Sequence, residues 1–248
     1  VGGIDRVYEI GRVFRNEGVD STHSPEFTTL ECYETYADQF VMAERMKEII
    51  QSCAKAVGTE RIETENGTID LFGEWKWVGV YPGLSEVVGV EITPETDASV
   101  LREIAEKHEV DIDPKWEAEK LVTELFGEIV EPTLVNPTFV YDYPPSAQPL
   151  ARPHRSGEPL IEAWDLIIGG MERGTAFSEL IDPVIQRERL TAQSLLAAAG
   201  DDEAMELDED FLRALEHGAP PMGGLGLGID RLIMLLAGDQ DPECPGTV

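Results

Sequence analysis

The segment at 223–236, GGLGLGIDRLIMLL, constrains the fold of this chain more than any other. Glycine recurs at every second position, Gly224, Gly226 and Gly228, so that a β-strand here would allow a ligand or another backbone to approach one face closely. The apolar run that follows predicts a helix with Arg231 in its first turn, where the helix dipole favours phosphate. The spacing is not that of the G-x-G-x-x-G fingerprint, so the motif alone is weak and gains meaning only with the rest of the chain.

Two segments near the start of the chain predict an antiparallel hairpin. Residues 6–14 and 26–34 are rich in β-branched and aromatic side chains, and a polar stretch with glycine, serine and proline separates them. Alternation along the second strand places four residues on one face: Phe27, Thr29, Glu31 and Tyr33. A carboxylate between two aromatic side chains suits the recognition of a cation better than it suits a core.

The rest of the chain predicts helices in blocks and strands separated by loops of variable length. Capping signals and helical spacing predict helices at 38–57, 97–108, 114–130, 183–199 and 208–218. Strand-like composition marks 75–81, 134–142, 161–168 and 171–180, with Gly169-Gly170 as a tight turn. This order favours an α+β fold, an antiparallel sheet flanked by helices, over a regular βαβ arrangement.

The middle of the chain differs from the rest because it is charged and carries no motif. We predict a small inserted helical segment at about 85–130 within one domain that covers 1–248. Asp113-Pro114 has the form of an N-cap followed by proline at the first helical position, so we expect the second helix of this segment to begin there.

Charged residues gather around the predicted hairpin loop. Arg15 ends the first strand, where its planar guanidinium can donate parallel hydrogen bonds to a phosphate and a carboxylate. Glu17 can accept from an adenine amino group and Phe27 can stack on a purine, with His23 between them in the chain. Single arginines and glutamates in hairpin loops are usually surface ion pairs of little energetic value, so the order and spacing of the group carry the interpretation.

Two glutamates, Glu172 and Glu179, lie in an otherwise apolar strand segment. Solvated faces are the ordinary place for paired carboxylates, but within apolar strands they are costly unless a cation neutralises them, as Mg²⁺ bridging ATP phosphates would. A flat strand directs side chains seven residues apart to opposite faces. A shared metal therefore requires an irregular strand near Gly174, and a regular ladder is the alternative.

The chain is strongly acidic, with 49 Asp and Glu against 19 Lys and Arg and a formal net charge of −30. Such a surface disfavours nonspecific binding of nucleic acids and anionic membranes, although a solubilising surface is the simpler explanation of the acidity. A phosphate site would need the few cations gathered in one place. No apolar run is long enough to span a bilayer. Cys32, Cys53 and Cys244 lack metal-ligand spacing, so we expect reduced thiols in a cytoplasmic protein.

Together, YEIGRVFRNEGVDSTHSPEFTTLECYETYAD and GGLGLGIDRLIML resemble motifs 2 and 3 of the class II aminoacyl-tRNA synthetases, and of the lysyl type in particular. Further segments follow in the order of that family, among them EPTL, PTFVYDYP, PLAR and FSEL-x-DP-x-x-QR, so the resemblance spans nearly the whole chain. It implies a homodimeric enzyme that uses ATP and Mg²⁺ to activate lysine and transfers it to tRNA(Lys).

The resemblance also implies a role for each matching residue. Arg15 and Arg231 would be catalytic. The ATP site would consist of Arg15, Glu17, His23, Phe27, Glu172, Glu179 and Arg231. The amino-acid pocket would consist of Glu31, Tyr33, Thr175, Phe177, Glu179, Gly224 and Gly226. Magnesium would be held by Glu172 and Glu179.

Some features depart from the family pattern. Thr175 stands where the family more often has asparagine, and the arginine-containing tail is not seen after Gly238. Motif 1, a glutamate that binds the lysine amino group and the anticodon-binding barrel are expected before Val1. We therefore predict a piece of a longer protein that is impaired in charging tRNA by itself.

Two alternatives remain open. A related enzyme would pass the lysyl group to a translation factor or into a lipid pathway. A non-catalytic module of this type would bind a ligand without chemistry. The joint presence of five residues argues against it: Arg15, Glu17, Glu172, Glu179 and Arg231. Aspartyl- and asparaginyl-type enzymes share the architecture, whereas Glu31 and Glu179 suit a long ammonium side chain.

Overall fold

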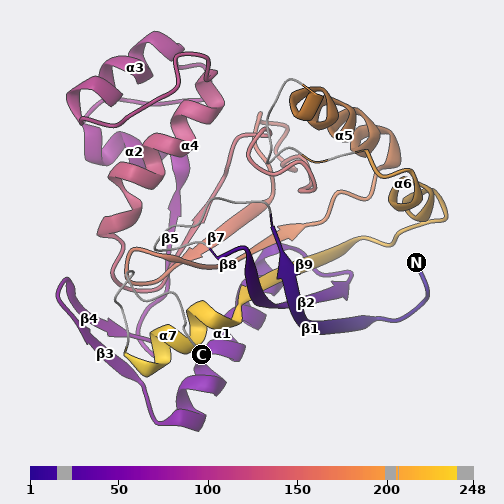
Figure 1. Ribbon diagram of the computed structural model, residues 1–248, viewed down its shortest axis with the longest axis horizontal. Helices are drawn as coiled ribbons and strands as arrows, with labels where there is room; N and C mark the ends of the chain where they lie inside the picture. The colour runs from indigo at the N-terminus through magenta and orange to yellow at the C-terminus, as the bar shows by residue number, and fades with distance from the viewer. Residues whose placement is uncertain (16–23, 199–204, 206, 239–248) are drawn as a thin grey trace.

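The computed structural model describes residues 1–15, 24–198, 205 and 207–238. Its centre is a seven-stranded sheet in the order β1-β2-β9-β8-β7-β6-β5 (Figure 1). The strands are β1 (Arg6–Phe14), β2 (Glu26–Thr35), β5 (Lys76–Gly79), β6 (Thr138–Tyr141), β7 (Ala163–Ile167), β8 (Glu172–Ser178) and β9 (Met222–Gly228). Neighbours are antiparallel except β5 and β6, which run parallel. The predicted α+β fold with a mostly antiparallel sheet is confirmed, as is the hairpin of β1 and β2.

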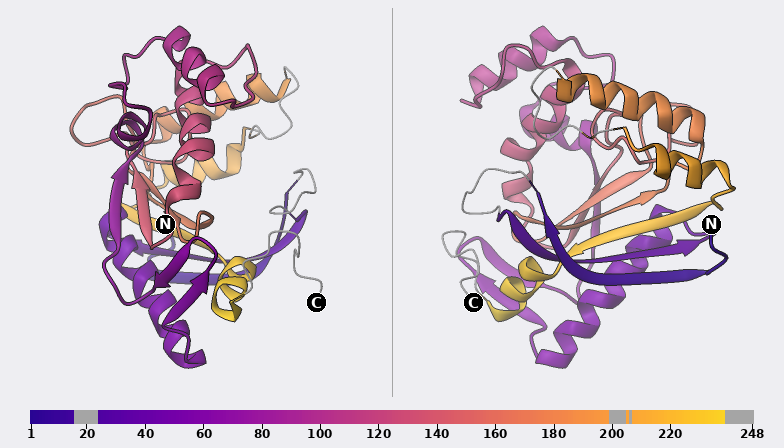
Figure 2. Two further views of the ribbon diagram at one scale, coloured as in Figure 1. Left: turned by 90° about the vertical axis from the view of Figure 1, so that its left-hand side faces the viewer. Right: turned by 45° about the vertical axis from the view of Figure 1, so that its right-hand side comes forward.

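One face of the sheet is covered by α1 (Gln39–Val57) together with α7 (Ile229–Ala237), whereas α5 (Pro183–Ala198) and α6 (Glu209–Glu216) lie on the other side (Figures 1 and 2). The predicted helix at 38–57 is confirmed: Asp38 Oδ1 accepts from the amides of Phe40 and Val41 at 3.1 and 3.2 Å, and Gly58 ends the helix in the left-handed conformation. The apolar stripe of α1 packs on Leu166, Ala176 and Leu225 of the sheet. The first core therefore lies beneath β9, β8 and β7.

A second core is formed by α2 (Val80–Val88), α3 (Ala98–Lys107) and α4 (Ala118–Ile129), which lie together beyond β5 and β6 (Figure 1). Leu84, Leu101 and Leu125 are fully buried there. Whether this unit is an insertion stays a prediction. The strand predicted at 75–81 ends at Gly79, because residues 80 and 81 already belong to α2.

The prediction that Asp113-Pro114 opens a helix is wrong. Asp113 Oδ1 accepts from the amide of Lys115 at 2.8 Å, and its carbonyl accepts from the amide of Trp116 at 3.0 Å. These bonds close a local turn, which competes with helix formation, and α4 begins only at Ala118.

The strand predicted at 134–142 is shorter than expected. A 3₁₀ turn, η1 (Glu131–Thr133), comes first, and the carbonyls of Leu134 and Val135 accept from the amides of Gly170 and Gly169 at 3.0 and 2.9 Å. These residues therefore support the β7–β8 turn and do not extend the ladder. In that turn Gly169 and Gly170 have φ of 68° and 71°, as a type I′ hairpin turn requires, so the predicted tight turn is confirmed.

The remaining elements frame the sheet. A small hairpin, β3 (Arg61–Thr64) and β4 (Gly67–Asp70), follows α1. The helices predicted from residues 183 and 208 form α5 and α6, each preceded by an aspartate whose carboxylate accepts from backbone amides in the first turn. Within the described residues, no helix combines the length and apolarity that crossing a membrane requires.

Candidate active site

The sheet face opposite α1 carries the predicted site. The strand register sets two rows of residues side by side across β2, β9, β8 and β7: Glu31–Gly226–Thr175–Asp165 and Tyr33–Gly224–Phe177–Ala163. All predicted members of the amino-acid pocket on these strands therefore share one face. The alternation of Phe27, Thr29, Glu31 and Tyr33 along β2 is as predicted.

The glycines of β9 leave room that side chains from neighbouring strands occupy. A Cβ at Gly226 would stand 3.1 Å from Glu31 Oε1. A Cβ at Gly224 would overlap Glu179 Oε1 and lie 2.6 Å from the ring of Tyr33. Glycine is required at 224, and at 226 it spares the Glu31 carboxylate a tight contact, so the two glycines let Glu31, Tyr33 and Glu179 converge over β9.

One end of this face is acidic and poorly solvated. Burial, and then the neighbouring charge of Glu31, raises the pKa of Glu179 to about 8. Burial also raises the pKa of Glu31, although hydrogen bonds from Thr29 and Tyr33 and the charge of Arg15 oppose the shift. The pKa of Tyr33 is raised by burial and by Glu179. Two partly buried carboxylates, one of which raises the pKa of the other, form a site at which a cationic group is favoured.

A β-bulge in β8 decides the position of Glu172. Leu166 pairs with Gly174 but Ile167 pairs with Glu172, so Arg173 is the extra residue of the bulge. The bulge turns Glu172 onto the face that carries Thr175, Phe177 and Glu179. Of the two alternatives left open by the sequence, the irregular strand near Gly174 is the one present. A Cβ at Gly174 would come within 2.5 Å of the Gly226 carbonyl oxygen, so the close strand approach also requires glycine there.

Glu172 and Glu179 share a face but have different surroundings. Glu172 acts electrostatically on Asp165 and Glu131, and its carboxylate lies 3.9 Å from Arg231 Nη1. Glu179 interacts with Glu31 and Tyr33. Among the described residues, no group of three or more His, Cys, Asp or Glu side chains is arranged to hold a metal ion. Glu172 opens β8 and Glu179 follows its last residue, so at ~3.3 Å per residue the two lie roughly 20 Å apart along the strand. A single ion cannot contact both carboxylates at that distance. Mg²⁺ that takes its other oxygen ligands from a nucleotide therefore stays a proposal for each glutamate separately.

The cationic residues lie toward the opposite end of β2. The guanidinium carbon of Arg15 stands 5.1 Å from the centre of the Phe27 ring, and the amide of Arg15 donates to the carbonyl of Pro25 at 3.1 Å. Arg231 projects from the first turn of α7, and its Nη1 donates to the Glu172 carbonyl at 3.0 Å. Glu17 and His23 lie outside the described residues.

The sequence did not single out three further residues of this face. Burial and the charge of Glu172 raise the pKa of Asp165 to about 7, against hydrogen bonds from Thr175 and Tyr143. Burial, Glu172 and Asp165 raise the pKa of Glu131 to about 7. Asp165 is the one acidic residue in the apolar run AWDLII, and Glu131 opens the EPTL segment, so both had a signal in the sequence. Tyr143 lies in the segment PTFVYDYP, so it had a signal of the same kind as Glu131.

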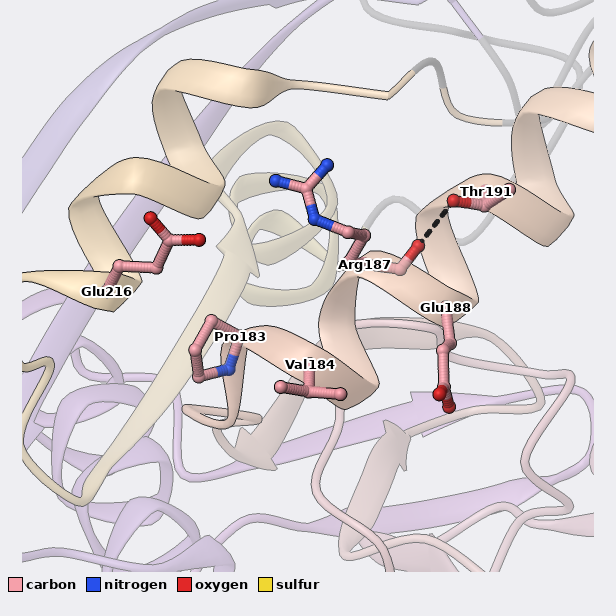
Figure 3. A pocket seen from close by; sticks show the side chains of 6 residues that line it. All are labelled: Pro183, Val184, Arg187, Glu188, Thr191 and Glu216. Atoms are coloured by element: carbon pink, nitrogen blue, oxygen red, sulfur yellow. Dashed lines mark hydrogen bonds between the residues drawn. The ribbon is translucent and has the colours of Figure 1, made fainter.

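A surface hollow between α5 and α6 is lined by Pro183, Val184, Arg187, Glu188, Thr191 and Glu216 (Figure 3). Arg187 donates from both terminal nitrogens to the Glu209 carboxylate at 2.7 and 2.8 Å, and its carbonyl accepts from the Thr191 hydroxyl at 2.7 Å. None of the predicted site residues lines this hollow. It is therefore separate from the candidate active site.

The chain is similar to proteins of two names. It is 50% identical over 241 residues to the lysine--tRNA ligase of Kineococcus radiotolerans and 54% identical over 242 residues to that of Mycolicibacterium gilvum, in each case over 96% of this chain and 48% of the relative. It is 50% identical over 249 residues to the lysylphosphatidylglycerol biosynthesis bifunctional protein LysX of Gordonia bronchialis, over 98% of this chain and 22% of that protein. The chain thus spans about half the length of these ligases and about a fifth of LysX.

The family model for class II tRNA synthetases (D, K and N) matches residues 1–241. That range includes every described element of the sheet and every residue of the face set out above. The chain therefore belongs to the class II tRNA synthetases (D, K and N), as a domain of the lysyl-tRNA synthetase type.

Proposed function

We propose that the protein activates lysine with ATP, giving lysyl-adenylate and pyrophosphate, and transfers the lysyl group to tRNA(Lys). The observation that carries the proposal is the convergence of Glu31, Tyr33 and Glu179 over the glycines of β9. Two arginines accompany it: Arg15 lies beside Phe27 of β2, and Arg231 contacts Glu172 of β8. One end suits an ammonium group and the other suits phosphates.

Lysine recognition follows from the charge of the buried pair. An ammonium group between Glu31 and Glu179 would offset the cost of their burial, and Phe177, one row along β8, would pack on the alkyl stem. The side chain of aspartate would face two carboxylates, and that of asparagine would leave both unneutralised. The pocket therefore discriminates against the amino acids of the two related enzyme types.

The nucleotide would lie along β2 toward Arg15. Phe27 would stack on adenine, Glu17 would accept from the adenine amino group, and His23 would join Arg231 at the outer phosphates. An oxygen of the lysine carboxylate attacks the α-phosphorus, and the bond to the pyrophosphate oxygen breaks in line with it. Arg15 stabilises the charge that develops on the α-phosphate, so catalysis rests on positioning and charge neutralisation.

Magnesium bound with ATP would neutralise phosphate charge, and Glu172 and Glu179 are the residues that would hold it. The bulge in β8 turns both glutamates to one face but leaves them at opposite ends of the strand, so each would meet a different magnesium ion along the nucleotide. We extend the proposal to a cytoplasmic homodimer for the whole protein, on the strength of the family resemblance.

A second candidate function shares the adenylation step but differs in the acceptor. The name of the LysX relatives refers to lysylphosphatidylglycerol biosynthesis, and LysX of Gordonia bronchialis is as similar to this chain as the ligase of Kineococcus radiotolerans, at 50% identity. The described residues of the pocket serve both candidates equally. Incubation of the whole protein with ATP, lysine and either tRNA(Lys) or phosphatidylglycerol distinguishes them.

The pocket itself can be tested on this chain by calorimetric titration with α,β-methylene-ATP and Mg²⁺ present. We expect lysine to bind and aspartate and asparagine not to bind. Glu179→Gln should weaken lysine binding by at least about a hundredfold, because it removes the charge of a buried ion pair. Equal binding of the three amino acids, or unchanged binding by the variant, would refute the proposal.

A further inference from the structure

Arg173, the extra residue of the β8 bulge, is a buried arginine that the proposed mechanism does not use. Its side chain is 2% exposed. Its Nε donates to the carbonyl of Ile168 at 3.2 Å, and its Nη1 donates to the carbonyl of Arg231 at 3.0 Å. The side chain thus crosses from the bulge to the first turn of α7.

A second bond runs in the opposite direction. Arg231 Nη1 donates to the carbonyl of Glu172, the residue next to Arg173 in the bulge, at 3.0 Å. The side chain of each arginine therefore holds the backbone at or beside the other. Two bonds of opposite direction between β8 and α7 leave little freedom for either segment to shift along the other.

Burying this cation is expensive. Burial, and then the nearby charge of Arg231, lowers the pKa of Arg173 to about 10. An apolar side chain of similar volume would fill the same space at less cost, so stability alone is a poor reason for arginine here. The planar fork of arginine can instead donate to two carbonyls in fixed directions, which a flexible apolar chain cannot do.

We infer that Arg173 is a positioning residue for nucleotide binding: it fixes the first turn of α7 against the bulge, so that the Arg231 guanidinium and the Glu172 carboxylate keep their places for the phosphates. The inference rests on the proposed function, because it assigns the phosphates to Arg231. It concerns the nucleotide end of the face alone. The two bonds of Arg173 given above go to the carbonyls of Ile168 and Arg231, whereas the lysine end lies elsewhere on the face, at Glu31 and Glu179.

The test measures the affinity of this chain for α,β-methylene-ATP with Mg²⁺ and, separately, for lysine. Arg173→Met should weaken nucleotide binding roughly ten- to a hundredfold, the range expected for lost charge-assisted hydrogen bonds, and leave lysine binding within twofold. Arg173→Lys keeps the charge but not the planar fork, so its nucleotide affinity should lie between those of the unaltered chain and Arg173→Met. If Arg173→Met does not fold, the same split between nucleotide and lysine in Arg173→Lys decides the question.

A double variant separates positioning from general stability. Once Arg231 has been replaced by methionine, adding Arg173→Met should weaken nucleotide binding little further, because Arg173 acts through Arg231. Arg102→Met is the matched control: Arg102 Nη2 also donates to two carbonyls, those of Pro114 and Trp116 at 3.1 and 2.7 Å, but within the α2–α4 unit. It should lower the melting temperature without changing nucleotide affinity.

The outcomes separate a failure of this inference from a failure of the proposed function. Additive losses in the double variant, or equal losses of nucleotide and lysine binding in Arg173→Met, would overturn the inference while the unaltered chain still binds both ligands. An unaltered chain that binds neither ligand would overturn the proposed function and the inference with it.

Discussion

The backbone amide of Thr28 on β2 donates a 2.7 Å hydrogen bond to Oδ2 of Asp230 in the first turn of α7. The ladder between β2 and β9 ends at Thr29 and Gly228, so Asp230 continues it with a side chain where β9 has turned into a helix. The bond ties the start of β2, and with it Phe27, to the helix that carries Arg231. An aspartate at a helix N-terminus also interacts favourably with the helix dipole.

Replacing Asp230 by alanine should therefore destabilise the chain by about 0.5–1.5 kcal/mol, the range for a solvent-exposed hydrogen bond, and should weaken binding of α,β-methylene-ATP. Urea unfolding and calorimetric titration measure the two effects. Asp230→Asn keeps an acceptor oxygen, so it should lose less stability and less nucleotide affinity than the alanine variant. An alanine variant with the stability and nucleotide affinity of the original chain would show that the bond is incidental.

Gly224→Ala should abolish lysine binding while nucleotide binding survives. The new methyl group would overlap Glu179 Oε1 and crowd the Tyr33 ring, so at least one of them must leave the pocket. Titration of lysine and of the nucleotide analogue into the variant gives the two affinities.

Gly127→Ala is the matched control for that substitution. Gly127 lies inside α4 and a Cβ there meets nothing within 4 Å, so alanine should stabilise the helix by up to about 1 kcal/mol and leave both affinities unchanged. Normal lysine binding by Gly224→Ala would contradict the pocket assignment.

The ion pair of Glu162 and Arg155 predicts a pH dependence of stability. The Glu162 side chain is fully buried; burial alone would raise its pKa, but hydrogen bonds from Arg155 at 2.6 and 2.8 Å and from Ser178 outweigh that and hold the pKa at about 2. Because this folded-state pKa lies below the unfolded value of 4.5, the stabilisation is present above pH 4.5 and is lost as pH falls toward 2.

Arg155→Met should reverse this dependence. Glu162 would remain buried without its cation, its pKa would rise above 4.5, and the cost of its charge would grow with pH. We expect a loss of about 3 kcal/mol at pH 7.5 that shrinks at pH 5, measured by urea unfolding. Arg213→Met breaks the exposed pair with Asp210 and should cost less than about 1 kcal/mol at both pH values. An equal loss at pH 7.5 and pH 5 for Arg155→Met would count against the pair.

Divalent metal should bind to this chain together with nucleotide and only weakly without it. Glu172 and Glu179 lie at opposite ends of β8, and within the described residues no three His, Cys, Asp or Glu side chains are arranged to hold a metal ion. Paramagnetic resonance with Mn²⁺ as a probe should show affinity at least about tenfold higher when α,β-methylene-ATP is present. Glu172→Gln should reduce that gain. Tight Mn²⁺ binding without nucleotide would show that the chain builds a metal site by itself.

Much of the site was predictable because its signals are local in sequence. Alternation along β2 placed Phe27, Glu31 and Tyr33 on one face, and the repeated glycines of β9 marked the strand that these side chains overlie. The helix cap at Asp38 and the Gly169-Gly170 turn were predictable for the same reason, because each depends on the chemistry of two or three neighbouring residues.

Other features depend on contacts between distant segments. Whether Asp113 opens a helix or closes a turn is a competition between local hydrogen bonds, which the dipeptide pattern does not decide. The length of β6 was set by carbonyls of residues 134 and 135 that bond to the β7–β8 turn. Asp165 and Glu131 acquired raised pKa values only because folding buries them beside Glu172.

The sequence by itself determined the family, the fold class and the charge character of both ends of the site, since these follow from residue types and their spacing. The tertiary structure decided which face Glu172 occupies and what Arg173 contacts. Both depend on a one-residue bulge, and a shift of one residue in a strand reverses the face of the side chains beyond it. The pairing of β8 with β7 sets that shift, and no local pattern in residues 172–178 specifies it.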